Sequence, residues 1–434
     1  MKQFFITLLG LFLGVYSSQA QNLLTVKDAI EIALIQNYDI QLSKNVKEIS
    51  TESVSYGAAG FLPTVTANAT QNNSILNLEQ TQSSGVVRSL KNAKNNSLNY
   101  GVSLGWTVFD GLGMFRRYDI LKQNNNFQDV QYKQSVLITI SAVMSNYYNI
   151  VEQTNVYNAL QSVREISLER YKIAEARFTI GKASKLEVLN AQVNLNEDES
   201  NLIRQANTIK SLKIQLNTLL ARDLSEDFTV HEKMDYDQQL NYTELHEMAM
   251  QQNPEIVKIE VNRKISELSL QEIRSKRYPT LRLNAGYNFS ETESSLGFTT
   301  SSNSKGLSYG FAVSMNLFDG FAQSRNEKIA KMNIESIELQ SKNQNQVLSS
   351  LLLTTFSNYQ TFQSLVKVEE NNVILAKNSL DITNDKFKIG TVSSVEFRDS
   401  QENYINAVAR YNAALLDTKL AEIELKQIIG KLDV

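Results

Sequence analysis

The feature that most constrains this chain is an internal repeat of more than 200 residues. Short motifs of the first half return in the second half in the same order. The matching pairs are Phe61-Leu62-Pro63-Thr64 with Arg277-Tyr278-Pro279-Thr280, Asn37 with Asn253, Phe109-Asp110-Gly111 with Phe318-Asp319-Gly320, and Arg177-Phe178-Thr179-Ile180-Gly181 with Lys386-Phe387-Lys388-Ile389-Gly390. The first two pairs are offset by 216 residues and the last two by 209, so one insertion lies in the first copy. Solenoid repeats are about 20–50 residues long, and this spacing therefore indicates a duplicated half-molecule.

The sequence predicts four consecutive parts: a signal peptide at 1–20, a first repeat at 21–222, a linker at 223–241 and a second repeat at 242–434. The signal peptide is expected because Lys2, an apolar run and Ser17-Ser18-Gln19-Ala20 follow the order of a basic start, a hydrophobic stretch and a small-residue cleavage site. The apolar run is shorter than the roughly 20 residues that a spanning helix needs. The mature protein is therefore expected outside the cytoplasm.

Each repeat predicts the same order of elements. A helical stretch (Thr25–Gly57, then Thr243–Lys276) ends before Pro63 or Pro279, because proline cannot continue a helix. A pair of strands follows, at 64–109 and 280–318, with one apolar and one polar face at period two. Polar loops at 79–96 and 291–305 are expected to join the paired strands.

Asp110 and Asp319 follow these strands and are candidate N-caps of the next helix. Proline-free stretches at 112–180 and 321–389 predict helices of about 100 Å. Shorter helices return at 184–221 and 393–429, with hairpin tips near Gly181 and Gly390.

The long helices carry apolar residues at a stride of seven, the pattern of coiled-coil packing. The second long helix has two such rows, which are Val366, Val373, Leu380 and Phe387, and Val368, Leu375, Ile382 and Ile389. The first returning helix has one, which is Val188, Leu195, Leu202, Ile209 and Leu216. Two rows on one helix favour contacts with two neighbours, as in a ring of helices. An ordinary antiparallel hairpin bundle remains an alternative.

Composition excludes several classes of protein. The chain has no Cys, which removes disulfides, thiol catalysis and lipid attachment to cysteine. Its formal charge of −3 argues against binding nucleic acid, which usually requires a basic excess. His231 and His246 have no partners at metal-ligand spacing, and we expect no metal, no cofactor and no catalytic residues. Acidic pairs such as Asp198-Glu199 are interpreted as solvated helix surface.

The strands raise the question of what covers their apolar face. A secreted protein with apolar-out, polar-in strands fits a transmembrane β-barrel, although a soluble half-buried sheet would show the same alternation. Four strands cannot close a barrel, and the smallest membrane barrels have about eight. Several copies must therefore contribute, since unpaired backbone groups are costly in lipid. Two copies give a filled barrel, and three give twelve strands around a water-filled lumen.

Taken together, these motifs resemble the TolC family of outer-membrane efflux proteins over essentially the whole mature chain. The resemblance rests on the duplication, on Phe-Asp-Gly twice, and on two tips that read Gly181-(x)2-Ser184-(x)2-Glu187-(x)2-Asn190 and Gly390-(x)2-Ser393-(x)2-Glu396-(x)2-Asp399. It implies an α+β membrane protein that forms a homotrimer in outer-membrane lipid. The trimer would have a 12-stranded β-barrel continued by a periplasmic α-helical barrel. It also implies a periplasmic adaptor (membrane fusion) protein and an inner-membrane pump as partners.

The resemblance also implies roles for single residues. Glu396 and Asp399, and more weakly Glu187, match positions that form an acidic constriction at the periplasmic end. Gly181, Ser184, Gly390 and Ser393 match the surface that contacts the adaptor. The implied function is passive export through a tripartite efflux or type I secretion system. The alternative from another class is a secreted structural coiled-coil or adhesin protein without a channel.

Overall fold

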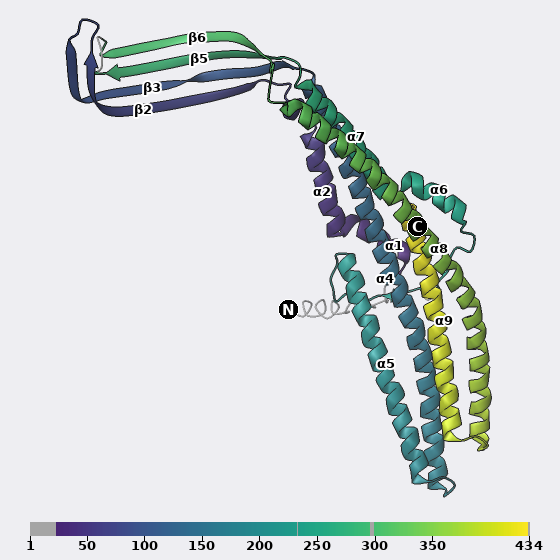
Figure 1. The fold of residues 1–434 in the computed structure, drawn as a ribbon. Helices are drawn as coiled ribbons and strands as arrows, with labels where there is room; N and C mark the ends of the chain where they lie inside the picture. Colours follow the sequence, from purple (N-terminus) through teal and green to yellow (C-terminus); the bar gives the residue numbers. More distant parts are fainter. Residues whose placement is uncertain (1–22, 232, 296–298, 433–434) are drawn as a thin grey trace, which may run out of the picture. The chain divides into compact units, whose positions relative to one another are not determined.

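The protein is described by a computed structural model that covers residues 23–231, 233–295 and 299–432. The predicted signal peptide at 1–20 lies outside the described residues. The chain is mostly helical with one four-stranded sheet, so the predicted α+β fold is confirmed (Figure 1). Within the described ranges, no helix combines the length and the apolarity that a bilayer crossing requires.

Apart from the short α3, which has no counterpart among the described residues of the second half, the two halves contain helices and strands in the same order. The first half contains β1 (Leu23–Leu24), α1 (Val26–Gln36), α2 (Tyr38–Ser53), α3 (Tyr56–Ala59), β2 (Thr64–Thr81), β3 (Val87–Asp110), α4 (Gly113–Thr179) and α5 (Lys185–Leu219). The second half contains β4 (Thr229–Val230), α6 (Tyr242–Gln252), α7 (Pro254–Ser275), β5 (Thr280–Ser294), β6 (Ser301–Ser314), α8 (Ala322–Ile389) and α9 (Ser394–Ile428).

The chain forms two compact units that each draw on both halves. Of the described residues, unit 1 comprises those within 23–43, 133–253 and 346–432, and unit 2 those within 44–132 and 254–345. Unit 1 holds the main apolar core, in which Val143 and Ile150 of α4 pack with Leu216 of α5, Phe228 and Ile423 of α9. The hairpin ends of α4 and α5 and of α8 and α9 belong to this unit.

The first helical stretch of each copy is broken, whereas the sequence predicted one continuous helix. Asn37 separates α1 from α2, and Asn253 separates α6 from α7, each with extended backbone (ψ 128° and 125°). The Asn37 side chain donates to the carbonyl of Leu219 (2.9 Å), and Asn253 donates to Ile428 (2.8 Å). Asparagine competes for backbone groups in this way and favours helix ends over helix interiors.

Unit 2 holds an antiparallel sheet in the order β2-β3-β5-β6 (Figure 1). Its register places most of the apolar residues of all four strands on one face of the sheet and most of the polar residues on the other. One face carries the apolar rows, and the other carries Thr, Ser, Asn and Gly. β2 and β6 lie at the edges, and every residue of β6 is exposed.

The loops that the sequence predicted at 79–96 and 291–305 are largely strand, so both predictions were wrong. β2 and β3 continue pairing to Thr81 and Val87 around a tight turn, in which Gln82 donates its backbone N–H to Val86 (2.9 Å). β5 and β6 likewise extend to Ser294 and Ser301. Polar side chains predominate there and the few apolar ones, such as Val87 and Leu90, do not alternate regularly, so backbone pairing continues where hydrophobic alternation has ended.

Candidate functional site at the helical hairpin tips

The two hairpin tips are built by the same local chemistry. Gly181 and Gly390 have left-handed backbone (φ +73° and +84°). Each donates its N–H to the carbonyl three residues earlier, while the N–H of the next residue reaches the carbonyl five residues back, which is the Schellman arrangement. Ser184 and Ser393 then accept from the N–H of Glu187 and Glu396 (both 3.2 Å) and cap α5 and α9.

Of the three predicted constriction acids, Glu187 and Glu396 lie in the first turns of the returning helices, and Asp399 lies in the second turn of α9. Glu187 and Glu396 stand at the third helical position, where a negative charge interacts favourably with the helix dipole. Glu396 and Asp399 are exposed, and Glu187 is half-buried. Among the residues that the structure describes, none of the three forms an ion pair. Within the described residues, the negative charges of these carboxylates are therefore not neutralised by an ion pair.

The two predicted capping aspartates lie in unit 2, beside the first turns of α4 and α8. Asp110 Oδ1 accepts from the N–H of Met114 (3.0 Å), and Asp319 Oδ2 accepts from Gln323 (2.8 Å). Asp110 also pairs with Arg117 at 2.6 Å. Each carboxylate thus satisfies one backbone donor that a helix start leaves without a partner.

A buried charged network, which the sequence analysis missed, joins the two hairpins above their tips. Arg398 of α9 contacts Asp198 of α5 at 2.7 Å, and Asp198 accepts from Ser167 of α4 at 2.6 Å. Gln401 donates to the same serine at 3.1 Å. Asp198 is only 2% exposed, so its interpretation as solvated surface was wrong. Burial lowers the pKa of Arg398, but the hydrogen bond and charge of Asp198 outweigh it and raise that pKa.

Two further arginines of α4 contact the second tip. Arg170 is 3% exposed and its guanidinium lies 5.2 Å from the ring centres of both Phe387 and Phe397. Burial, followed by repulsion from Arg398, lowers the pKa of Arg170. Arg177 Nη2 donates to the carbonyls of Lys388 (2.8 Å) and Phe387 (3.3 Å) in the last turn of α8. The first hairpin therefore holds the second through cationic side chains as well as apolar packing.

The sequence did contain a signal for this network. The apolar row that includes Val188, Leu195 and Leu202 has a companion row three residues later, in which Ala191 is followed by Asp198. Ala191 is 2% exposed. An acidic residue in a row that is otherwise buried predicts a buried partner of opposite charge. The position in the heptad, rather than the neighbouring Glu199, was the informative feature.

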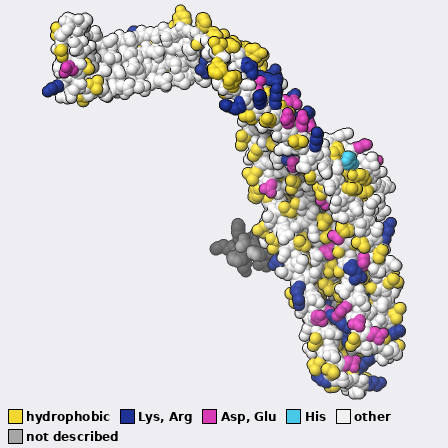
Figure 2. Space-filling model, in the orientation of Figure 1, with side chains coloured by type: hydrophobic (Ala, Val, Ile, Leu, Met, Phe, Trp, Pro, Cys, Tyr) yellow, Lys and Arg dark blue, Asp and Glu magenta, His cyan; other side chains and the backbone are white. Residues whose placement is uncertain are grey.

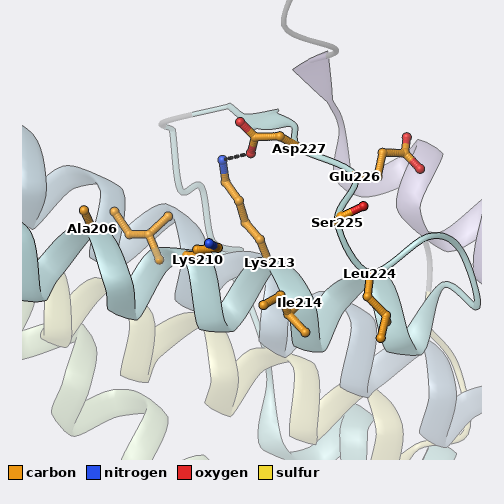
Figure 3. A pocket seen from close by; sticks show the side chains of 9 residues that line it. Ala206, Lys210, Lys213, Ile214, Leu224, Ser225, Glu226 and Asp227 are labelled. Carbon is orange, nitrogen blue, oxygen red and sulfur yellow. Dashed lines mark hydrogen bonds and ion pairs between the residues drawn. The ribbon is translucent and has the colours of Figure 1, made fainter.

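The linker that separates the repeats is part of unit 1 rather than a free tether. β4 pairs in parallel with β1, and Phe228 is 1% exposed. A cavity of about 640 Å³ lies between α5 and residues 224–227, with Ile214 and Leu224 among its apolar lining (Figure 3). Lys213 Nζ contacts Asp227 at 2.6 Å and, by this hydrogen bond, lowers the pKa of that carboxyl. The ion pair joins α5 to the linker beside the cavity.

The two histidines lie away from the tips. His231 is exposed, and His246 is half-buried with Nε2 at 3.3 Å from Ser349. In the described part of the chain, no three His, Asp or Glu side chains come close enough to hold a metal ion.

Comparison with known proteins gives a family match over both halves. The model of the family described as outer membrane efflux protein matches residues 29–222 and 245–431. Outer membrane protein TolC from Escherichia coli (strain K12) is 20% identical over 444 residues, which cover 100% of this chain and 87% of the relative. TolC from Salmonella enteritidis gives the same identity and coverage over 443 residues.

Solved structures share the fold. The Campylobacter jejuni CmeC outer membrane channel aligns with a TM-score of 0.74 at 17% identity, over 93% of this chain and 85% of that one. The open state of the Neisseria gonorrhoeae MtrE outer membrane channel aligns with a TM-score of 0.73 at 16% identity, over 94% and 89%. Since the family model covers both halves and the fold agrees throughout, the chain belongs to the outer membrane efflux protein family.

Proposed function

We propose that three copies of this outer-membrane efflux channel assemble into one duct, the exit of a tripartite efflux or type I secretion system. In this proposal the sheets form a 12-stranded barrel in the outer membrane, and the helices form a periplasmic tube. A periplasmic adaptor and an inner-membrane pump deliver the substrate, which leaves unchanged. Membership of the family favours this duct over a secreted structural protein.

The observation that carries the proposal is a sheet with one lipid-compatible face and two open edges. On that face Trp106 aligns with Leu283 and Phe311 at one end, and Tyr100 aligns with Phe289 at the other. The segment of β5 whose alternate residues form the apolar face extends from Leu281 to Phe289. It is about nine residues long, the length of a strand that crosses a bilayer. Aromatic side chains at both ends of the band match the girdles of membrane barrels.

The edges of this sheet call for further strands. In the described residues β2 pairs only with β3 and β6 only with β5. Tyr309 is 83% exposed and Phe311 74%. In lipid, open backbone edges cost several kcal/mol for each unsatisfied group. Pairing of β6 in one copy with β2 in the next satisfies both edges, and three copies supply the twelve strands.

The helices provide independent support. Of the two heptad rows on α8, one is buried within the chain, with Leu380 at 0% and Phe387 at 4% exposure. The other row stays exposed, with Leu375 at 58% and Ile382 at 56%. A sustained apolar row that finds no partner in its own chain is expected to pack on another helix. The second row therefore provides a seam to a neighbouring copy.

Within such a duct the tips acquire the proposed roles. Three copies of Glu396 and Asp399, with Glu187 nearby, would ring the periplasmic end with negative charge, and such rings favour cations. The turns at Gly181, Ser184, Gly390 and Ser393 are exposed and would contact the adaptor.

The proposal is tested by assembly and conduction of the full chain. The expected results are recovery from outer membranes, a trimer in native mass spectrometry and ion conductance in planar bilayers. Because the chain has no Cys, adaptor contact is tested by cross-linking from Ser184→Cys or Ser393→Cys, with the exposed Ser162→Cys as the matched control. A monomer that fractionates with soluble periplasmic proteins would refute the duct.

A further inference from the structure

The polar face of the sheet carries almost no charge. Five successive rows of this face consist of Thr, Ser, Asn and Gly, and beyond them, toward the β2–β3 turn, the face carries Leu76, Leu78 and Leu90 and the charged Arg88. The rows are Thr64, Gly105, Asn284 and Gly310; Thr66, Ser103, Gly286 and Ser308; Asn68, Gly101, Asn288 and Gly306; Thr70, Asn99, Ser290 and Ser304; and Asn72, Ser97, Thr292 and Ser302. The sheet surface seen in Figure 2 is correspondingly white over most of its length, the colour of uncharged polar groups and backbone.

One row near the base differs. Thr107 aligns with Arg282 and Ala312, and the Arg282 side chain is exposed on the polar face. Its Nε donates to Thr107 Oγ1 at 3.4 Å, and in the described residues no carboxylate lies within ion-pair distance of it. The nearest acidic residue on this face is Asp110, one row further toward the base, and Asp110 is already paired with Arg117 at 2.6 Å. The charge of Arg282 is therefore left without a counter-charge on the polar face.

We propose that Arg282 sets the charge preference of the membrane-spanning part of the duct, where three copies form a cationic ring that favours anionic over cationic solutes. This inference rests on the proposed trimer, whose lumen the polar face would line. Rings of Arg or Lys select anions in other pores. The duct would then contain two charge filters of opposite sign, Arg282 in the barrel and the acidic residues at the tips.

The geometry of a twelve-stranded barrel sets the size of the effect. Strands about 4.8 Å apart and tilted by about 40° give a barrel radius of about 12 Å. Three charges at that distance from the axis change the ratio of chloride to potassium permeability on the order of tenfold at 10 mM salt, where the Debye length is about 30 Å. At 1 M salt the Debye length is about 3 Å and the effect is expected to vanish.

The test is the reversal potential of single trimers in planar bilayers under a KCl gradient. Arg282→Gln should shift selectivity toward potassium at low salt and leave it unchanged at 1 M salt, whereas Arg282→Lys should keep the wild-type value. The matched control is Lys305→Gln, which removes a cation from the opposite face of the same sheet, opposite Phe289.

In a second variant the charge is changed only after the trimer has folded and entered the bilayer. Because the chain has no Cys, Arg282→Cys can be modified in the bilayer with a cationic or an anionic thiol reagent. The cationic adduct should restore anion preference, and the anionic adduct should move selectivity further toward potassium. Two outcomes in conducting trimers would overturn the role of Arg282 and leave the proposed function standing. In one, neither adduct changes the selectivity; in the other, Lys305→Gln shifts the selectivity as much as Arg282→Gln. Absence of trimers or of conductance in the unaltered protein would instead overturn the proposed function.

Discussion

Replacing Arg398 by Met removes the cation that neutralises a buried carboxylate and keeps most of the apolar stem. Asp198, which is 2% exposed in the unaltered protein, would keep its hydrogen bond from Ser167 at 2.6 Å but lose the guanidinium at 2.7 Å. Breaking a buried pair on one side costs about 3–5 kcal/mol, because an uncompensated charge stays inside. Relief of the repulsion between Arg398 and Arg170 offsets part of this cost. We therefore expect a loss of about 3 kcal/mol in the stability of the second tip.

The assay is hydrogen exchange of peptides from the first turns of α9 in the full-length protein. A loss of about 3 kcal/mol increases exchange through local opening by roughly 100-fold, because each 1.4 kcal/mol is a factor of ten. The matched control is Arg410→Met, whose partner Glu369 lies at 3.1 Å while Arg410 itself is 55% exposed. Exposed pairs contribute at most about 1 kcal/mol, so the control should change exchange less than about fivefold.

A double variant separates loss of the pair from loss of packing. In Arg398→Met with Asp198→Leu neither charge of the pair is left buried, and replacing both members of a buried pair by apolar residues is often neutral. Exchange should therefore return to within about tenfold of the unaltered protein. If the double variant exchanges as fast as Arg398→Met alone, or if Arg410→Met has the same effect, the reasoning from burial is wrong.

Three further predictions follow from the tips and from a buried acid. Glu396→Ala with Asp399→Ala should raise the single-channel conductance and lower the cation selectivity of the proposed constriction, and unchanged values would remove both residues from it. Gly181→Ala should destabilise the first tip by about 1–2 kcal/mol in hydrogen exchange, because φ is +73° although its Cβ would meet no atom within 4 Å. Burial raises the pKa of Glu152, so ionisation destabilises the fold as pH rises above about 4.5 through that higher pKa. Glu152→Gln should therefore raise the melting temperature at pH 7.5 but not at pH 4, and an equal gain at both pH values would contradict this origin.

The helices were predictable from sequence because their ends carry strong local chemistry. The expected helix at 112–180 is α4 (Gly113–Thr179), and the expected helix at 393–429 is α9 (Ser394–Ile428). Glycine in left-handed backbone and serine N-caps define the tips at the level of single residues. The break at Asn37 was missed, because an asparagine inside an apolar pattern ends a helix only if its side chain finds partners such as the Leu219 carbonyl.

The strand ends and the buried charges were missed for a different reason. Pairing beyond Leu78 depends on backbone hydrogen bonds between β2 and β3, and polar side chains carry no periodic signal for it. The heptad position of Asp198 indicates burial, but neither the burial of Arg170 nor the partner of Asp198 follows from the sequence unless the neighbouring hairpin is known. Their burial depends on contacts between residues far apart in sequence, such as Arg398 and Asp198, which are 200 residues apart.

The duplication itself gives this network a further meaning. With the 209-residue offset, Asp198 corresponds to Ala407 and Arg398 to Leu189, so the ion pair has no counterpart in the equivalent contact. In the proposed trimer that equivalent contact joins the second hairpin of one copy to the first hairpin of the next, and Leu189 is 47% exposed in the single chain. Separating Leu189 from its neighbour would cost only apolar area, whereas separating Arg398 from Asp198 would leave two charges buried or newly hydrated. The charged contact therefore occurs only between the two hairpins of one chain. If the hairpin tips separate, we expect the contacts between copies to break before the contacts within a chain.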